Sequence, residues 1–237
     1  MLLTIAPFLT DRVMQQPMHI PDGFLSTAVS VVLWVVAVFF IWLALKRSRQ
    51  ALGERQVPLT GVLAAFIFAA QMLNFTVAGG TSGHFLGAAL ATLLVGPWVS
   101  VLILTCVVSV QALLFQDGGL IALGANIVNM AIVGSFTAYF AYVVLTQILG
   151  KSNLALWISR FGAGWLSIVI ASLVCGLELG VSGTSPFAVA LPAMGGVHAL
   201  IGIGEGLITT AALALIYSTR RDLVSFRPTL SAAGREG

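Results

Sequence analysis

The sequence predicts an all-α polytopic membrane protein with seven transmembrane helices, the third of them short. Of its 237 residues, 59% are hydrophobic and only 8% are charged, whereas a soluble domain averages about 25% charged residues. Mean hydropathy is +1.04. This composition excludes a cytosolic enzyme, a disordered protein and a nucleic-acid-binding domain. The position of the few basic residues then sets the number of helices.

Helices are expected where uncharged runs reach the roughly 20 residues that a membrane crossing needs. These runs lie at 24–45, 59–77, 84–115, 120–149, 161–179 and 187–217. The run 84–115 is long for one crossing and contains Gly96-Pro97. Proline removes a backbone donor and disfavours helix in the residue before it. This run is therefore one long kinked helix, or a short helix at 84–95 followed by a full one at 98–115.

The basic residues favour the second reading. They follow the first run, flank the start of 161–179 and occupy the tail: Lys46, Arg47, Arg49, Arg55; Lys151, Arg160; Arg220, Arg221, Arg227, Arg235. With six crossings, the basic loop after the first helix and the basic tail fall on opposite sides of the membrane. With seven crossings, all three groups fall on one side, which the positive-inside rule makes cytoplasmic. The N-terminus is then outside and the C-terminus cytoplasmic. The short third helix cannot span alone and is expected to pack inside protein.

The chain divides into three parts, of which only one is a domain. Residues 1–17 form an N-terminal extension, 18–219 a single membrane domain and 220–237 a short cytoplasmic tail.

The histidines fall toward the predicted outer side. His19 precedes the first helix, His84 begins the short helix, and His198 lies about three turns into the last one. They could converge on an outward-facing cavity. Imidazole suits zinc, copper, nickel and cobalt, although each histidine alone could equally be a hydrogen-bonded packing residue.

Other polar residues in or near the apolar runs are candidates for supporting roles. Glu178 and Glu205 lie within apolar runs, and intramembrane acids are functional candidates by default. Glu205 follows His198 by two helical turns, so the two share a face. Asn74, Asn126 and Asn129 fall at the outer ends of helices. Each could ligate a metal, support a ligand by hydrogen bonding, or only cap a helix.

The segment Met18-His19-Ile20-Pro21-Asp22-Gly23 allows a specific chelate. If Met18 is the true amino terminus, its amine, the His19 amide nitrogen and the His19 imidazole can hold one ion through fused five- and six-membered rings. A fourth, open position would take another imidazole. A square-planar site of four nitrogens favours Ni(II) or Cu(II), and Co(II) can be held similarly. Asp22 could orient a ligand from outside the chelate.

These motifs resemble the CbiM/NikM family, the substrate-binding (S) components of cobalt/nickel energy-coupling-factor (ECF) transporters. The matching stretches are Met18-His-Ile-Pro-Asp-Gly-Phe-Leu25, Gly79-Gly-Thr-Ser-Gly-His-Phe-Leu-Gly87, Gln116-Asp-Gly-Gly-Leu120, Leu123-Gly-Ala-Asn126, Asn129-Met130 and Gly196-Val-His-Ala-Leu-Ile-Gly-Ile-Gly-Glu-Gly206. The motifs together span about 18–217, and their combination is specific to this family.

The resemblance implies a transport component and no enzyme. It implies that Ni²⁺ or Co²⁺ is the transported substrate, ligated by Met18, His19 and His84, with Asp22, Asn74, His198 and Glu205 in support and no cofactor. It further implies a multi-pass protein of the bacterial or archaeal plasma membrane. Its implied partners are a transmembrane coupling (T) protein, a cytoplasmic ATPase pair and a small auxiliary membrane subunit. Ala65 and Ala69 are candidate contacts for the T protein.

Residues 1–17, which precede the signature, would prevent formation of the chelate. While they stay attached, the Met18 nitrogen is part of a peptide bond and Met18 has no free amine. This stretch lacks a basic start and a small-residue cleavage site, which argues against a signal peptide. We expect translation to begin at Met18.

Two other functions fit parts of the sequence. A stand-alone metal channel or secondary transporter could use Glu178 and Glu205 as proton carriers. A rhomboid-like intramembrane serine protease could use Ser82 or Ser182 of the two Gly-x-Ser-Gly stretches with His198 as base.

Overall fold

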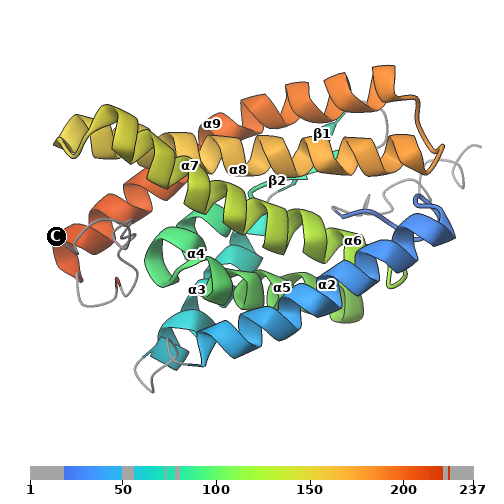
Figure 1. The fold of residues 1–237 in the computed structure, drawn as a ribbon, viewed down its shortest axis with the longest axis horizontal. Helices are drawn as coiled ribbons and strands as arrows, with labels where there is room; N and C mark the ends of the chain where they lie inside the picture. The colour runs from blue at the N-terminus through green and yellow to red at the C-terminus, as the bar shows by residue number, and fades with distance from the viewer. Residues whose placement is uncertain (1–18, 50–55, 73, 78–80, 221–223, 225–237) are drawn as a thin grey trace, which may run out of the picture.

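The fold is a set of apolar helices of unequal length (Figure 1). The computed structural model describes residues 19–49, 56–72, 74–77, 81–220 and 224. Met18, the expected extension 1–17 and most of the expected tail lie outside the described residues.

Five helical segments in the described ranges are long and apolar enough to cross a membrane. They are α2 (Thr27–Ser48), α5 (Pro97–Phe115), the segment Leu123–Leu149, α8 (Asn153–Val181) and α9 (Phe187–Thr219). The segment Leu123–Leu149 comprises α6 (Leu123–Asn126), the π-helix η1 (Ile127–Val133) and α7 (Gly134–Leu149). Two shorter helices are α3 (Gln56–Gln71) and α4 (Ala88–Val95). The predicted all-α membrane architecture is confirmed, while the number of crossings and their orientation stay predictions.

One short hairpin departs from the predicted helices. The sequence predicts helix throughout 59–77 and a helix that begins at His84, and both predictions are wrong there. Helix α3 ends at Gln71, and β1 (Asn74–Val77) pairs antiparallel with β2 (Thr81–His84), with Asn74 opposite His84. The aromatic and β-branched residues of β1 suit a strand. His84 is therefore the last residue of a strand and lies outside the helices.

Helix α4 is short and fully enclosed, as predicted. All of its 8 residues are buried, and it packs against α5, α7, α8 and α9. Gly96 separates it from α5 with a φ of 88°, a conformation that glycine adopts without strain. Pro97 is the first residue of α5, where its missing N–H removes no intrahelical hydrogen bond.

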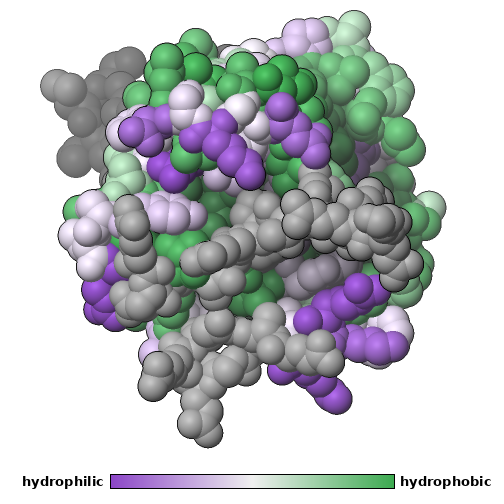
Figure 2. Space-filling model, turned by 60° about the vertical axis from the view of Figure 1, so that its left-hand side comes forward, coloured by the Kyte–Doolittle hydropathy of each residue, from purple (hydrophilic) through white to green (hydrophobic). Residues whose placement is uncertain are grey.

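The basic segments lie at one end of the molecule. Lys46 and Arg47 end α2, Lys151 lies in the turn between α7 and α8, and Arg220 follows α9. Figure 1 draws these three places toward the left, away from the turn between α8 and α9. Figure 2 brings that end forward and shows hydrophilic residues on it, with hydrophobic residues along the flanks. This arrangement is what the positive-inside argument requires.

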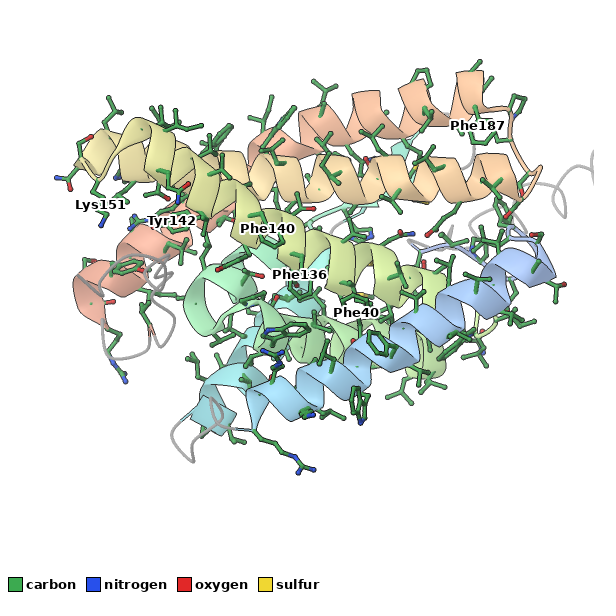
Figure 3. The ribbon with its side chains drawn as sticks, viewed as in Figure 1. Phe40, Phe136, Phe140, Tyr142, Lys151 and Phe187 are labelled. Carbon is green, nitrogen blue, oxygen red and sulfur yellow. The ribbon has the colours of Figure 1, made fainter. Side chains whose placement is uncertain are left out.

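Aromatic and small residues hold the helices together. Phe40 of α2 meets Phe136 of α7, and Phe140 lies one turn further along α7 (Figure 3). The Phe136 ring meets Phe40 edge-on at 6.1 Å between centroids and Trp98 of α5 at 4.8 Å. Helices α8 and α9 approach through glycine, since a Cβ on Gly164 would lie 3.0 Å from the Cα of Gly206.

Candidate metal centre

Residues 19–22, just before α2, are held by Asn126 of α6 and by the loop that precedes α6, an arrangement called the clasp below. The Ile20 N–H donates to Asn126 Oδ1 at 3.0 Å, and Asn126 Nδ2 donates back to the Ile20 carbonyl at 3.1 Å. The same carbonyl accepts from the Gly119 N–H at 3.0 Å. The backbone of Ile20 is thus paired much as in a sheet, with a side-chain amide in place of a strand. These bonds fix the position of His19 next to it.

Asp22 fastens the other end of this segment. Its carboxylate accepts from the backbone N–H groups of Leu120, Ile121 and Ala122, at 3.1, 2.8 and 3.0 Å. A carboxylate is a strong acceptor for several backbone donors at once. Asp22 therefore anchors the loop to the segment that carries His19.

Gly118 lets the loop approach His19 closely. Its φ is +92°, and a Cβ there would lie 2.8 Å from the Cβ of His19 and 3.1 Å from Nδ2 of Asn126. A side chain at this position would be strained and would displace its neighbours. Gly118 of the Gln116-Asp-Gly-Gly stretch is therefore needed for this close approach.

Asp117 contacts His19 twice, and sequence reasoning missed it. The His19 N–H donates to Asp117 Oδ1 at 3.4 Å, and His19 Nδ1 lies 3.2 Å from Asp117 Oδ2. His19 is 5% exposed and Asp117 7% exposed. The matching Gln116-Asp-Gly-Gly stretch was a signal for this residue, although nothing in the local pattern indicates its partner.

His19 and His84 lie side by side. Their ring centroids are 4.9 Å apart, with the ring planes at 68°. His84 Nδ1 lies 2.8 Å from the Phe85 carbonyl, which can only accept. The proton is therefore on Nδ1, and Nε2 keeps its lone pair for another partner.

The buried position of His84 keeps its imidazole neutral. Burial, and then the neighbouring His19, lower the pKa of His84 to about 3. The neutral ring is the form that binds a metal ion.

Glu205 supports the segment that follows His84. Its carboxyl group accepts from the N–H groups of Leu86 at 2.7 Å and Gly87 at 2.9 Å. Gln71 Nε2 donates to the Leu86 carbonyl at 2.8 Å, and Gln111 Nε2 donates to Gln71 Oε1 at 3.0 Å. Helices α9, α3 and α5 are thus joined by buried polar contacts to the residues just after His84. Glu205 therefore anchors the backbone that follows His84.

The three histidines line one cavity of about 80 Å³. The structure thus brings the three histidines to one cavity. His198 Nδ1 lies 2.8 Å from the Met194 carbonyl, one helical turn away. Other lining residues are Ile20, Leu86, Asn126, Asn129, Met130, Ile168, Ala171, Ser172, Cys175 and Met194. Asn74 pairs with His84 through the strand register alone, because the position of its side chain is outside what the structure describes.

Side chains alone do not make a metal site in the described part of the chain. No group of three or more His, Cys, Asp or Glu residues there is arranged to hold an ion. The chelate expected from the sequence instead uses two imidazoles and two backbone nitrogens. One of the latter belongs to Met18, which lies outside the described residues.

The chain matches known proteins along most of its length. The model of the CbiM family, described as the cobalt uptake substrate-specific transmembrane region, matches residues 19–223. The cobalt transport protein CbiM of Sorangium cellulosum is 33% identical over 87% of this chain and 94% of its own length. The fused nickel transport protein NikMN of Rhodobacter capsulatus is 31% identical over 92% of this chain and 67% of its own.

A solved structure has the same fold. The crystal structure of a truncated transition metal transporter superposes with a TM-score of 0.78 at 32% identity, covering 85% of this chain and 99% of that one. The chain therefore belongs to the CbiM family of cobalt and nickel transport components of the cell membrane.

Proposed function

We propose that this chain is the substrate-binding (S) component of an ECF transporter, which captures Ni²⁺ or Co²⁺ from outside and delivers it inward. Four nitrogens would hold the ion: the Met18 amine, the His19 amide and imidazole, and the His84 imidazole. The observation that carries the proposal is the pair of buried imidazoles, 4.9 Å apart, at a cavity next to the start of the family signature. A planar set of nitrogens suits Ni(II).

The remaining candidates would support these ligands without touching the ion. Asp22 and Glu205 hold the two backbone segments that carry His19 and His84. His198 completes the wall of the cavity. Residues outside a metal's ligand set commonly fix ligand orientation in this way.

The test compares two forms of the protein, one beginning at Met18 and one retaining residues 1–17. We expect about one nickel per purified protein in the first form and almost none in the second, because an attached leader blocks the amine. Metal content by mass spectrometry gives the ratio. Equal occupancy of the two forms would refute ligation by the free amine.

Two histidine variants of the Met18 form separate ligand from support. His84→Ala should abolish nickel binding while size-exclusion elution stays unchanged. His198→Asn should weaken binding and keep the stoichiometry of the bound ion. Full binding by His84→Ala would exclude His84 as a ligand.

Inward delivery would be driven by a partner ATPase pair through a T protein, with a small auxiliary membrane subunit. Gly61, Ala65 and Ala69 are exposed on α3. Each is about one helical turn from the next, so they lie on one face of the helix. Such small residues let helices approach closely in a membrane. Ala65→Leu with Ala69→Leu should reduce co-purification with the T protein and leave nickel content unchanged.

Uptake of nickel by cells tests the motor directly. We expect uptake to stop when the partner ATPase is replaced by a hydrolysis-deficient form. Uptake that persists without the ATPase would favour a stand-alone channel or secondary transporter.

A further inference from the structure

One carboxylate faces both His19 nitrogens that the proposed chelate needs. The backbone N–H of His19 donates to Asp117 Oδ1 at 3.4 Å, and Nδ1 of the same residue lies 3.2 Å from Asp117 Oδ2. The six-membered ring of the chelate runs from this amide nitrogen through Cα, Cβ and Cγ to this Nδ1. The two oxygens of Asp117 thus lie where an ion bound to both atoms would have to approach.

This contact selects one rotamer of His19. A histidine side chain that points away from its own amide cannot chelate, because the amide nitrogen and Nδ1 must face the same point. A carboxylate that contacts both atoms holds them on the same side. The ring-closing conformation is therefore present before any ion arrives.

Asp117 is itself held in place by the end of α5. Gln116 ends this helix with a φ of 55°, which is uncommon for a residue other than glycine. The Asp117 N–H then donates to the Gln111 carbonyl at 3.1 Å. Next to it, Gly118 packs against the Cβ of His19, as described above. The turn fixes the carboxylate against His19, and Asp117 is only 7% exposed.

We infer that Asp117 is a positioning residue for metal capture, an inference that rests on the proposed function. In the metal-free protein it holds the amide nitrogen and Nδ1 of His19 together. When the ion binds, the amide N–H bond breaks, its proton passes to water, and Asp117 yields both nitrogen atoms to the ion. Its negative charge stays beside the cation without joining the ligand set. Preorganisation of this kind raises affinity by removing the ordering cost at the moment of binding. The negative charge of Asp117 beside the site attracts the metal cation and speeds its association.

The experiment measures nickel association by stopped flow and the absorption spectrum at saturation, with protein that begins at Met18. Asp117→Ala should slow association and weaken affinity at least tenfold, with the wild-type spectrum at saturating nickel. Asp117→Asn keeps the size and one acceptor oxygen, so its rate should fall between the two. Asp117→Glu, which restores the charge, should recover part of the rate.

Glu178→Gln is the matched control. It removes another buried carboxylate, whose hydrogen bond is to Asn129 Nδ2 at 2.7 Å and which makes no such contact with His19 in the described structure. We expect its association rate to stay within twofold of wild type. Size-exclusion elution and thermal unfolding show that each variant is folded.

The outcomes separate this inference from the proposed function. Equal association rates for wild type and Asp117→Ala overturn the positioning role. A changed spectrum in Asp117→Asn also overturns it, because Asp117 would then be a ligand. Failure of the wild-type Met18 form to bind nickel overturns the proposed function, and the inference with it.

Discussion

Replacement of Glu205 tests how the fold positions His84. Glu205 is 1% exposed and accepts two backbone N–H groups, those of Leu86 and Gly87. A buried donor left without a partner costs about 1–3 kcal/mol. Glu205→Ala orphans both donors, so it should destabilise this segment by roughly 2–6 kcal/mol. Glu205→Gln keeps one acceptor oxygen and orphans one donor, at a cost of about 1–3 kcal/mol.

The free energy lost by leaving these N–H groups unpaired should also appear as a loss of nickel affinity. The anchored residues lie two and three positions after His84, so an ion that needs His84 in place must restore their order on binding. A cost of 1–3 kcal/mol corresponds to a roughly 5- to 150-fold loss of nickel affinity for Glu205→Gln. Equilibrium dialysis against nickel, on purified protein in detergent, measures the affinity. Thermal unfolding of the same samples measures the stability.

Thr209→Val is the control for this prediction. Thr209 lies one turn further along α9, is 0% exposed, and its hydroxyl has no hydrogen-bond partner among the described residues. Its replacement should leave nickel affinity unchanged. A Glu205→Gln protein with wild-type affinity would refute the reasoning. Lost stability with full affinity would limit Glu205 to a role in the fold.

Further predictions concern the clasp, the pH dependence and the packing of helices. Gly118→Ala should lower nickel affinity at least tenfold in equilibrium dialysis, since the new Cβ meets the Cβ of His19 at 2.8 Å; unchanged affinity would mean that the loop adjusts freely. The folded pKa of His84 is about 3, below its ordinary 6.5, so the unfolded chain binds the extra proton between these values. The thermal stability of the metal-free protein should therefore fall as pH drops from 6.5 toward 3, and less so in His84→Gln; equal slopes would contradict this. Gly206→Leu should lower the unfolding temperature, because a Cβ there would lie 2.6 Å from the Phe161 ring and 2.8 Å from its carbonyl oxygen; an unchanged temperature would show that α8 and α9 can separate without cost.

The sequence predicted best what depends on local composition. Long uncharged runs predicted the long helices, because the cost of an unpaired backbone in lipid leaves few alternatives. Gly96-Pro97 predicted the break after α4, since both residues act through their own backbone. The short, enclosed helix followed from the distribution of charge.

Contacts between distant segments were beyond such reasoning. The apolar run 59–77 continues past Gln71, yet the chain turns there and the Gln71 side chain bonds to Leu86. The pairing of β1 with β2 adds hydrogen bonds that composition does not reveal. Asp117 lies 98 residues from His19, and Asn126 lies 106 residues from Ile20. The motifs indicated which stretches matter, and only the fold shows which of them meet.

The clasp around residues 19–22 makes the start of this domain resemble a short peptide held by a receptor. Its bonds to Asn126 and Gly119 involve the Ile20 backbone, so they do not depend on the side chain there. Helix α2 keeps this segment attached to the rest of the chain, so its rebinding is intramolecular. A few ordinary hydrogen bonds are then enough to seat the peptide. Its departure would take His19 away from His84 without unfolding any helix, so an ion held as proposed would be released by one small, reversible dissociation.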